Sequence, residues 1–182
     1  MAVRVLGVDP GFRNLGLFGL RLTGIGSISA SFAKVITTKK VNKKHRILEA
    51  DDEIRCLEEI ERAFKDALST FMPDVVITEE RPKLRSNQAT AVVAMAFAAL
   101  HAITRANGIP FIVVSIPDIK LCVTGDRSAS KADMVKALKG KFPGFKGWPD
   151  SARVEHVADA GGAALCAQRH PVVEMLLRER AN

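Results

Sequence analysis

The chain has 182 residues, of which 47% are hydrophobic, and a formal net charge of +7. This length suits one domain, expected to span 1–182, and the absence of a long apolar run argues against a membrane protein. Cys56, Cys122 and Cys166 are far apart and lack zinc-ligand spacing, so buried free thiols are expected rather than disulfides or structural zinc. The N-terminus has no signal-peptide pattern, which favours a cytoplasmic or equivalent location, and the positive charge favours an anionic partner such as nucleic acid.

The first forty residues predict three antiparallel strands. Residues 3–8 are apolar and largely β-branched, as in a strand buried on both faces, and the turn residues Asp9-Pro10-Gly11 end this strand. Residues 15–22 and 27–36 have the pattern of two further strands. Their short connections favour antiparallel pairing, because a parallel return needs a crossover of a dozen or more residues.

Helices and strands alternate in the middle of the chain. Apolar residues at near-helical spacing predict an amphipathic helix over 47–71, and residues 75–77 predict a buried strand that ends at Glu79. The alanine-rich segment 87–106 predicts a second helix. This helix is so apolar that either the core or a partner subunit must cover it broadly.

The last third of the chain predicts a strand at 111–114, a helix at 128–141, an irregular loop at 143–149, a helix at 154–168 and an extension at 171–182. The predicted fold class is α/β. It is a mixed five-stranded sheet, with three antiparallel strands followed by two parallel ones, and helices on both faces.

Acidic residues are expected to meet at one edge of this sheet. If strand 75–77 lies parallel beside the first strand, Asp9 and Glu79 emerge at adjacent carboxyl ends, where such sheets bind ligands. Asp159 borders the apolar stripe of the last predicted helix, with His156 and Glu155 three and four residues before it. Taken singly, each residue also fits a role without catalytic function, as a turn aspartate, a solvated glutamate or a surface histidine.

Clustered carboxylates suggest a metal site. Carboxylates in a partly buried site repel one another unless a cation neutralises them, and hard oxygen ligands suit Mg²⁺ or Mn²⁺. Two such ions about 4 Å apart can activate a water and stabilise the leaving oxygen of a phosphodiester. The expected chemistry is therefore hydrolytic cleavage of nucleic acid.

The segments GVDPGFRNLG, VVITEE and VEHVADA, together with Lys120 and Lys131, resemble the RuvC family of Holliday junction resolvases. The resemblance covers about residues 3–168, the expected core. It implies an RNase H-like fold, a homodimer with its interface at helix 87–106, and symmetric metal-dependent incision of four-way DNA junctions.

The resemblance also assigns roles to the acidic set. It implies that Asp9, Glu79 and Asp159 hold metal, and that His156 is a ligand or assists in the transition state. Lys131, at a position where family members contact phosphate, is expected to stabilise negative charge on the scissile phosphate.

Basic residues predict a surface that faces DNA. They gather in the run 39–46, in the loop 81–85 and around Lys120. The predicted contacts are Lys39, Lys40, Lys43, Lys44, Arg46, Arg81, Lys83, Arg85, Lys120, Arg127 and Lys131. Solvated loops are the usual alternative for such runs. Many RuvC family members place an aromatic wedge after the glutamate of strand four, whereas this chain offers only Pro82 as an apolar candidate.

Other functions remain open on the sequence alone. A nuclease of the same fold acting on forks, flaps or RNA–DNA hybrids would use the same acidic set. A catalytically silent junction-binding protein would keep the fold for architecture. A DxG motif at a first strand also opens actin-like ATPases and sugar kinases, but these need a second domain that 182 residues do not supply.

Overall fold

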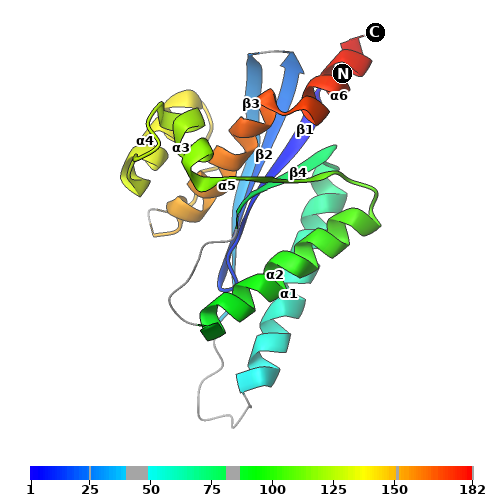
Figure 1. Cartoon of the computed structure of the whole chain (residues 1–182), viewed down its shortest axis with the longest axis vertical. Coiled ribbons are helices and arrows are strands. Elements are labelled where there is room, and N and C mark those ends of the chain that lie inside the picture. The colour runs from blue at the N-terminus through cyan, green and yellow to red at the C-terminus, as the bar shows by residue number, and fades with distance from the viewer. Residues whose placement is uncertain (25, 40–48, 81–86, 151, 182) are drawn as a thin grey trace.

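A computed structural model describes residues 1–24, 26–39, 49–80, 87–150 and 152–181 (Figure 1). The strands are β1 (Val3–Pro10), β2 (Asn14–Gly24), β3 (Ser27–Thr37), β4 (Val75–Glu79) and β5 (Phe111–Val114). The helices are α1 (Glu49–Phe71), α2 (Asn87–Ala106), α3 (Ile116–Thr124), α4 (Lys131–Lys141), α5 (Val154–Cys166) and α6 (Pro171–Ala181), with a 3₁₀ turn at Ala167–Arg169.

The five strands form one mixed sheet in the order β3-β2-β1-β4-β5. β1 runs antiparallel to β2, and β2 antiparallel to β3, whereas β4 lies parallel to β1 on its other side and β5 parallel to β4. The crossover through α1 permits this parallel return. The predicted mixed sheet is therefore confirmed, including the position of β4 beside β1.

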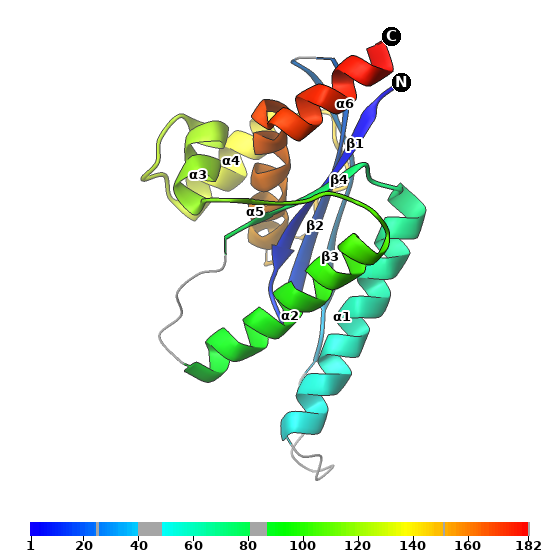
Figure 2. The same cartoon turned by 45° about the vertical axis from the view of Figure 1, so that its right-hand side comes forward.

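One face of the sheet is covered by α1 and α2. Leu6 and Val8 of β1 point to this face, where they belong to a buried cluster with Ile60 and Phe64 of α1 and Leu100 of α2. Figures 1 and 2 show the two helices side by side on this face. The charged residues of α1 alternate with these apolar positions, which is why its pattern predicted an amphipathic helix.

The opposite face is covered by α5, with α3 and α4 outside it (Figures 1 and 2). Val5, Phe18 and Ile77 form a second buried cluster with Val157 and Leu165 of α5. Successive side chains of a strand point to opposite faces, so one run of apolar residues supplies both clusters. Helices therefore lie on both faces, as predicted.

Two glycines let α5 lie directly on the sheet. A Cβ at Gly7 of β1 would stand 1.9 Å from the carbonyl oxygen of Ala160, and one at Gly16 of β2 would stand 2.2 Å from that of His156. Real Cβ atoms essentially never approach another atom this closely, so neither side chain would fit unless the helix backbone moved. The absence of these two side chains brings the helix backbone, and with it His156, against the strands.

The structure adds one helix that the pattern did not predict. α3 is short, begins at an N-cap made by Ser115 and ends at Gly125, which has a left-handed conformation. Pro117 lies in its first turn, where a helix tolerates proline, and the helix is only nine residues long. α4 begins at Lys131 rather than at 128, because Ser130 and Asp133 form a capping box there. The predicted helix 154–168 ends at Cys166 and continues as the 3₁₀ turn.

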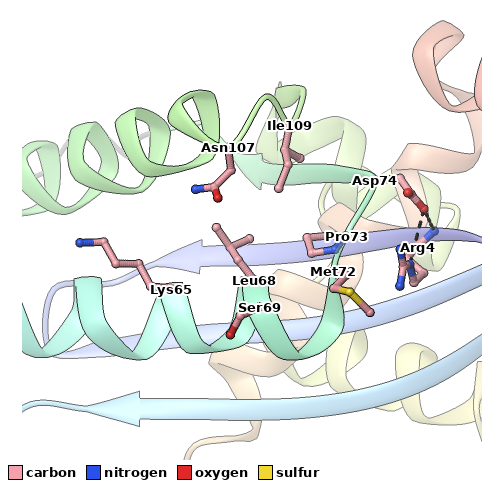
Figure 3. A pocket seen from close by; sticks show the side chains of 9 residues that line it. All are labelled: Arg4, Lys65, Leu68, Ser69, Met72, Pro73, Asp74, Asn107 and Ile109. Atoms are coloured by element: carbon pink, nitrogen blue, oxygen red, sulfur yellow. Dashed lines mark hydrogen bonds and ion pairs between the residues drawn. The ribbon is translucent and has the colours of Figure 1, made fainter.

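The C-terminal extension forms α6 and is attached to the start of the sheet. Arg180 makes two hydrogen bonds to the carboxylate of Asp74, at 2.6 and 2.9 Å, and Arg4 pairs with the same carboxylate. A pocket of about 380 Å³ lies beside this pairing and is lined by Arg4 and Asp74 (Figure 3). Because Asp74 precedes β4 whereas Glu79 ends it, the pocket lies at the opposite edge of the sheet from the acidic residues.

No helix in the described ranges is both long enough and apolar enough to cross a membrane. The cytoplasmic location expected from the sequence stays a prediction, as does the division into a core and an extension of one domain.

Candidate active site

Asp9 and Glu79 stand side by side at the carboxyl ends of two parallel strands. Val8 of β1 pairs with Thr78 of β4, so the next residue in each strand continues the register. Asp9 is two residues beyond Gly7, and Glu79 two beyond Ile77, so both carboxylates are on the face covered by α5. The period of the strands thus directs both side chains toward the helix that carries His156 and Asp159.

Asp9 is held by a contact with α5. Its Oδ2 lies 2.7 Å from Nδ1 of His156, and the two side chains are 12% and 30% exposed. The hydrogen bond to Asp9 raises the pKa of His156 above its ordinary value, although burial opposes this rise. The contact with Asp9 therefore favours the protonated form of the imidazole.

The surroundings of Glu79 and Asp159 disfavour the ionised form of both carboxyl groups. Burial, followed by the negative charges of Asp9 and Asp159, raises the pKa of Glu79 from 4.5 to about 8. Burial and the charge of Asp9 likewise raise the pKa of Asp159. The three carboxylates are thus close enough to affect one another, as the strand and helix pattern predicted.

Lys131 brings a positive charge to the same group. Its Nζ lies 3.6 Å from Oδ2 of Asp159 and 3.5 Å from Oε2 of Glu155, and the lysine side chain is 62% exposed. Burial opposes the charged form, but the attraction of Asp159 and Glu155 outweighs it and raises the pKa of Lys131. Lys131 is thus an exposed cation at the surface of the site, and the acidic residue Asp159 beside it is less exposed.

The donor set suits a divalent cation in its chemistry. It consists of hard carboxylate oxygens and one imidazole in a partly buried place with an excess of negative charge. As the side chains stand, however, no three His, Cys, Asp or Glu residues in the described part of the chain are grouped closely enough to hold a metal ion. His156 instead makes its contact with Asp9, through Nδ1 and Oδ2 at 2.7 Å.

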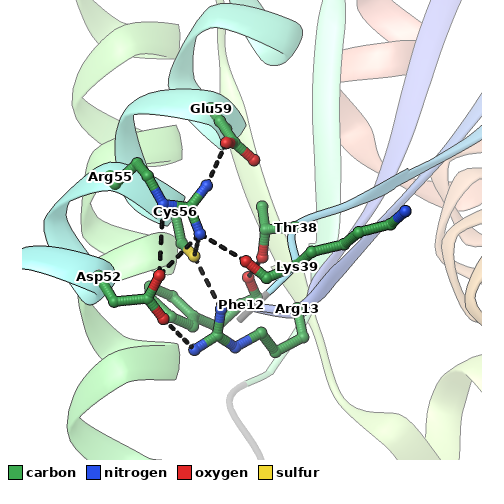
Figure 4. Close-up of polar contacts among 8 residues, drawn as sticks. All are labelled: Phe12, Arg13, Thr38, Lys39, Asp52, Arg55, Cys56 and Glu59. Atoms are coloured by element: carbon green, nitrogen blue, oxygen red, sulfur yellow. Dashed lines mark hydrogen bonds and ion pairs between the residues drawn. The ribbon is translucent and has the colours of Figure 1, made fainter. Parts of the chain in front are cut away.

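A second polar cluster fixes the loop that follows Asp9 (Figure 4). Arg13 donates to Sγ of Cys56 at 2.7 Å and to Oδ2 of Asp52 at 3.2 Å, and Arg55 binds Asp52 from the other side at 2.7 Å. Arg55 also donates to the carbonyl oxygen of Lys39. The cluster ties the β1–β2 turn and the segment just after β3 to α1.

Sequence reasoning did not identify this cluster. Asp52 and Arg55 have the spacing of a helical ion pair, and that signal was available. Arg13 is on a distant loop, and nothing in its local pattern predicts a contact with α1.

The predicted DNA contacts are only partly described. Lys39 and Arg127 are exposed, Lys120 is half-buried, and Arg127 forms an ion pair with Asp118 at 3.0 Å. The structure does not describe Lys40, Lys43, Lys44, Arg46, Arg81, Pro82, Lys83 or Arg85. The predicted contacts in the loops at 40–46 and 81–85 therefore lie outside the described residues.

No protein-family model matches the chain. In sequence, 164 residues are 27% identical to the crossover junction endodeoxyribonuclease RuvC of Thermus thermophilus, over 88% of this chain and 90% of that protein. The structure of T. thermophilus RuvC in complex with a Holliday junction substrate has a TM-score of 0.72 and 23% identity, and it covers 90% of this chain and 91% of its own.

The yeast mitochondrial Holliday junction resolvase Ydc2 has a TM-score of 0.67 at 19% identity, with coverage of 97% of this chain and 81% of its own. At these identities the two solved structures establish the fold. It is the RNase H-like fold of RuvC-type proteins, which confirms the expectation from the sequence. The similarity to RuvC inferred from GVDPGFRNLG, VVITEE and VEHVADA is likewise confirmed, and it extends over most of the chain.

Proposed function

Because its sequence and its fold both resemble those of the RuvC resolvases, we propose that this chain is a structure-selective DNA endonuclease that resolves Holliday junctions. The observation that carries the proposal is the meeting of Asp9, Glu79 and Asp159 at one edge of the sheet. Lys131 stands 3.6 Å from Asp159 at the mouth of this group. A set of partly buried carboxylates with an exposed lysine beside it suits the cleavage of a phosphodiester.

The carboxylates of Asp9, Glu79 and Asp159, with the imidazole of His156, would hold divalent cations, which we expect to be Mg²⁺, with Mn²⁺ able to substitute. When bound in such sites, these cations activate the attacking water and stabilise the leaving oxygen. Lys131 attracts and orients the scissile phosphate, and its charge stabilises the charge that develops on it. Glu79 releases its proton before it can act as a ligand, because ligands must be deprotonated.

We propose that His156 is first of all a positioning residue, which is held against Asp9 by a hydrogen bond. The hydrogen bond between its Nδ1 and Asp9 fixes the orientation of the ring, which leaves Nε2 either to bind a cation or to exchange a proton. Glu155 shares Lys131 with Asp159, and so holds the lysine at the edge of the site. Both contacts keep the acidic group compact.

The substrate proposed is branched DNA, held by basic residues around the site. Lys39, Lys120 and Arg127 are the described candidates for phosphate contacts, and the residues predicted in 40–46 and 81–85 lie outside the described part of the chain. Phosphate contacts fix the position of the DNA without reading its sequence. The Holliday junction substrate in the T. thermophilus RuvC complex supports a four-way junction as the preferred branch.

We also propose a homodimer with its interface at α2. Ala91, Met95, Ala98 and Ala102 are exposed and follow one another at helical spacing, and they form an apolar stripe on the side of α2 away from the sheet. An exposed apolar stripe of small residues suits close packing against a second helix. Under two-fold symmetry, such a dimer would present two active sites to two DNA strands.

Replacing Asp9 tests the function. Asp9→Asn should abolish cleavage of a mobile four-way junction in Mg²⁺ and leave junction binding largely intact, because it removes a ligand and not a DNA contact. Asp66→Asn, the same change at an exposed position of α1, is the matched control and should cleave as the unmodified protein does. Cleavage retained by Asp9→Asn in Mg²⁺ would refute the proposal.

The same assay separates the rival functions. Symmetric paired nicks in the four-way junction support a resolvase, whereas faster cleavage of a Y-fork, a flap or an RNA–DNA hybrid identifies another nuclease of this fold. Junction binding without any nicking in Mg²⁺ or Mn²⁺ identifies a silent junction-binding protein.

A further inference from the structure

Two of the three cysteines meet in the folded protein. Cys122 is in the last turns of α3 and Cys166 is the last residue of α5, and α3 packs against α5. Both side chains line the same pocket, where each thiol affects the pKa of the other, and the thiol of Cys166 lies 3.7 Å from the carbonyl oxygen of Asp118. Because they come from separate helices, their contact is produced by the tertiary structure.

The pair can be reached from solvent. Both cysteines are only half-buried, which corrects the expectation that all three thiols are buried; Cys56 alone is fully buried. Cys122 and Cys166 line a pocket of about 230 Å³, together with Leu121 and Arg169. A small oxidant can therefore approach sulfur from this pocket without unfolding of the helices.

The surroundings of the two thiols shift their pKa values in opposite directions, which indicates different roles for them in oxidation. The neighbouring thiol of Cys166, with the charges of Arg169 and Lys141, lowers the pKa of Cys122 to about 7, although burial opposes this change. The neighbouring thiol of Cys122, and then burial, raise the pKa of Cys166. Reactive cysteines are typically partly exposed, close to positive charge and beside a second thiol that can resolve the first oxidation product.

We propose that Cys122 and Cys166 are a reversible oxidation site, in which Cys122 reacts with hydrogen peroxide and Cys166 then closes an intramolecular disulfide. This inference is independent of the proposed nuclease function, because it uses no residue of the acidic site. It also departs from the prediction that the chain forms no disulfide.

The proposed reaction proceeds in two balanced steps. The thiolate of Cys122 attacks one oxygen of the peroxide, the O–O bond breaks, and the other oxygen leaves as water after taking up a proton, so Cys122 becomes a sulfenic acid. The sulfur of Cys166 then attacks the sulfenic sulfur. The S–O bond breaks, its hydroxyl leaves as water with the proton of Cys166, and an S–S bond forms. Overall, two thiols lose two electrons and one peroxide gains them.

The disulfide would join the end of α5 to α3. A disulfide stabilises a protein mainly by restricting the unfolded chain, and the loop from Cys122 to Cys166 is long enough for a substantial effect. We therefore expect oxidation to raise the melting temperature by about 5–10 °C. A reductant such as dithiothreitol should reverse the rise.

Peptide mapping of the whole chain after treatment with hydrogen peroxide tests the proposal. We expect a Cys122–Cys166 disulfide in the monomeric band of a non-reducing gel, and loss of this crosslink on reduction. Cys56→Ser is the matched control and should still form the crosslink, because Cys56 lies on the other face of the sheet. An absent crosslink, or one between two chains only, would overturn the proposal.

Two variants test the order of the steps. In Cys166→Ser, the sulfenic acid of Cys122 has no resolving thiol and should accumulate, so that dimedone labels it. In Cys122→Ser, dimedone should not label Cys166. Labelling of Cys166 in place of Cys122 would refute the assignment of the reactive thiol, and the mapping of the unmodified chain holds whether or not either variant folds.

Discussion

At the scale of single residues, the carboxylates of the site differ because their surroundings differ. Asp9 has His156 as a partner at 2.7 Å, and Asp159 has Lys131 at 3.6 Å. Glu79 has no ion pair among the described residues, and burial raises its pKa to about 8. In the absence of a cation, Glu79 is therefore mostly protonated at neutral pH.

Replacing Glu79 should stabilise the metal-free protein in a pH-dependent way. The folded chain keeps a proton on Glu79 that the unfolded chain releases above pH 4.5, so stability falls as the pH rises from 4.5 to about 8. Glu79→Gln removes this loss, which is roughly 2–4 kcal/mol near neutral pH. In the presence of a chelator, its melting temperature should exceed that of the unmodified protein at pH 7.5 and equal it near pH 4. An equal difference at both pH values would contradict the raised pKa.

Replacing Lys131 should slow the chemical step. Lys131→Met removes the charge beside Asp159 but keeps a long side chain, and the loss of one such donor costs about 10²-fold in rate. Single-turnover cleavage of a junction measures this effect. Lys136→Met is the matched control, since Lys136 is an exposed lysine on the same helix, α4. An equal loss in both variants would point to a general effect of charge on DNA binding.

At the scale of elements, the contact between α5 and the sheet positions half of the site. His156 and Asp159 reach the carboxyl ends of β1 and β4 because the helix backbone lies directly over Gly7 and Gly16. Overpacking at such a contact typically costs about 1–3 kcal/mol. The geometry of the acidic group is therefore sensitive to residues that take no part in its chemistry.

Gly16→Ala should harm both stability and cleavage. Its Cβ would stand 2.2 Å from the carbonyl oxygen of His156, so the helix has to move and His156 moves with it. We expect a melting temperature lower by about 2–10 °C and slower junction cleavage. Gly24→Ala, at the other end of β2, is the control, because its Cβ would have no neighbour within 4 Å. A Gly16→Ala protein as stable as Gly24→Ala would disprove the close contact.

At the scale of the whole molecule, the two helical layers differ in how much apolar surface they expose. α5 is enclosed by the sheet, α3 and α4, whereas α2 leaves its apolar stripe exposed. The exposed fraction of Met95 is 39%. A second copy of the chain at α2 would complete this layer and would set the distance between two active sites.

Met95→Glu should weaken the proposed dimer. A charge in the centre of an apolar contact loses its hydration without a partner, so the dimer should dissociate at concentrations where the unmodified chain is dimeric. Sedimentation velocity measures the change. Met175→Glu places the same substitution at an exposed methionine of α6 and should leave the association unchanged. A monomeric unmodified chain, or equal behaviour of both variants, would rule out this interface.

The sequence by itself determined where the acidic residues emerge. Asp9 and Glu79 each end a strongly apolar strand, and the spacing of His156 and Asp159 is that of one helix face. These signals are local, because a strand repeats every two residues and a helix about every 3.6. The mixed sheet followed from the lengths of the connections, and the similarity to RuvC from motifs at the same strand and helix ends.

Only the tertiary structure decided which side chains touch. The contacts of Arg13 with Cys56, of His156 with Asp9 and of Cys122 with Cys166 join elements far apart in the chain. No local pattern encodes such pairs, because they depend on how closely whole elements approach one another. Asp9 was identified from its place at a strand end, but its partner and its low exposure come from the packing of α5 on β1 and β2.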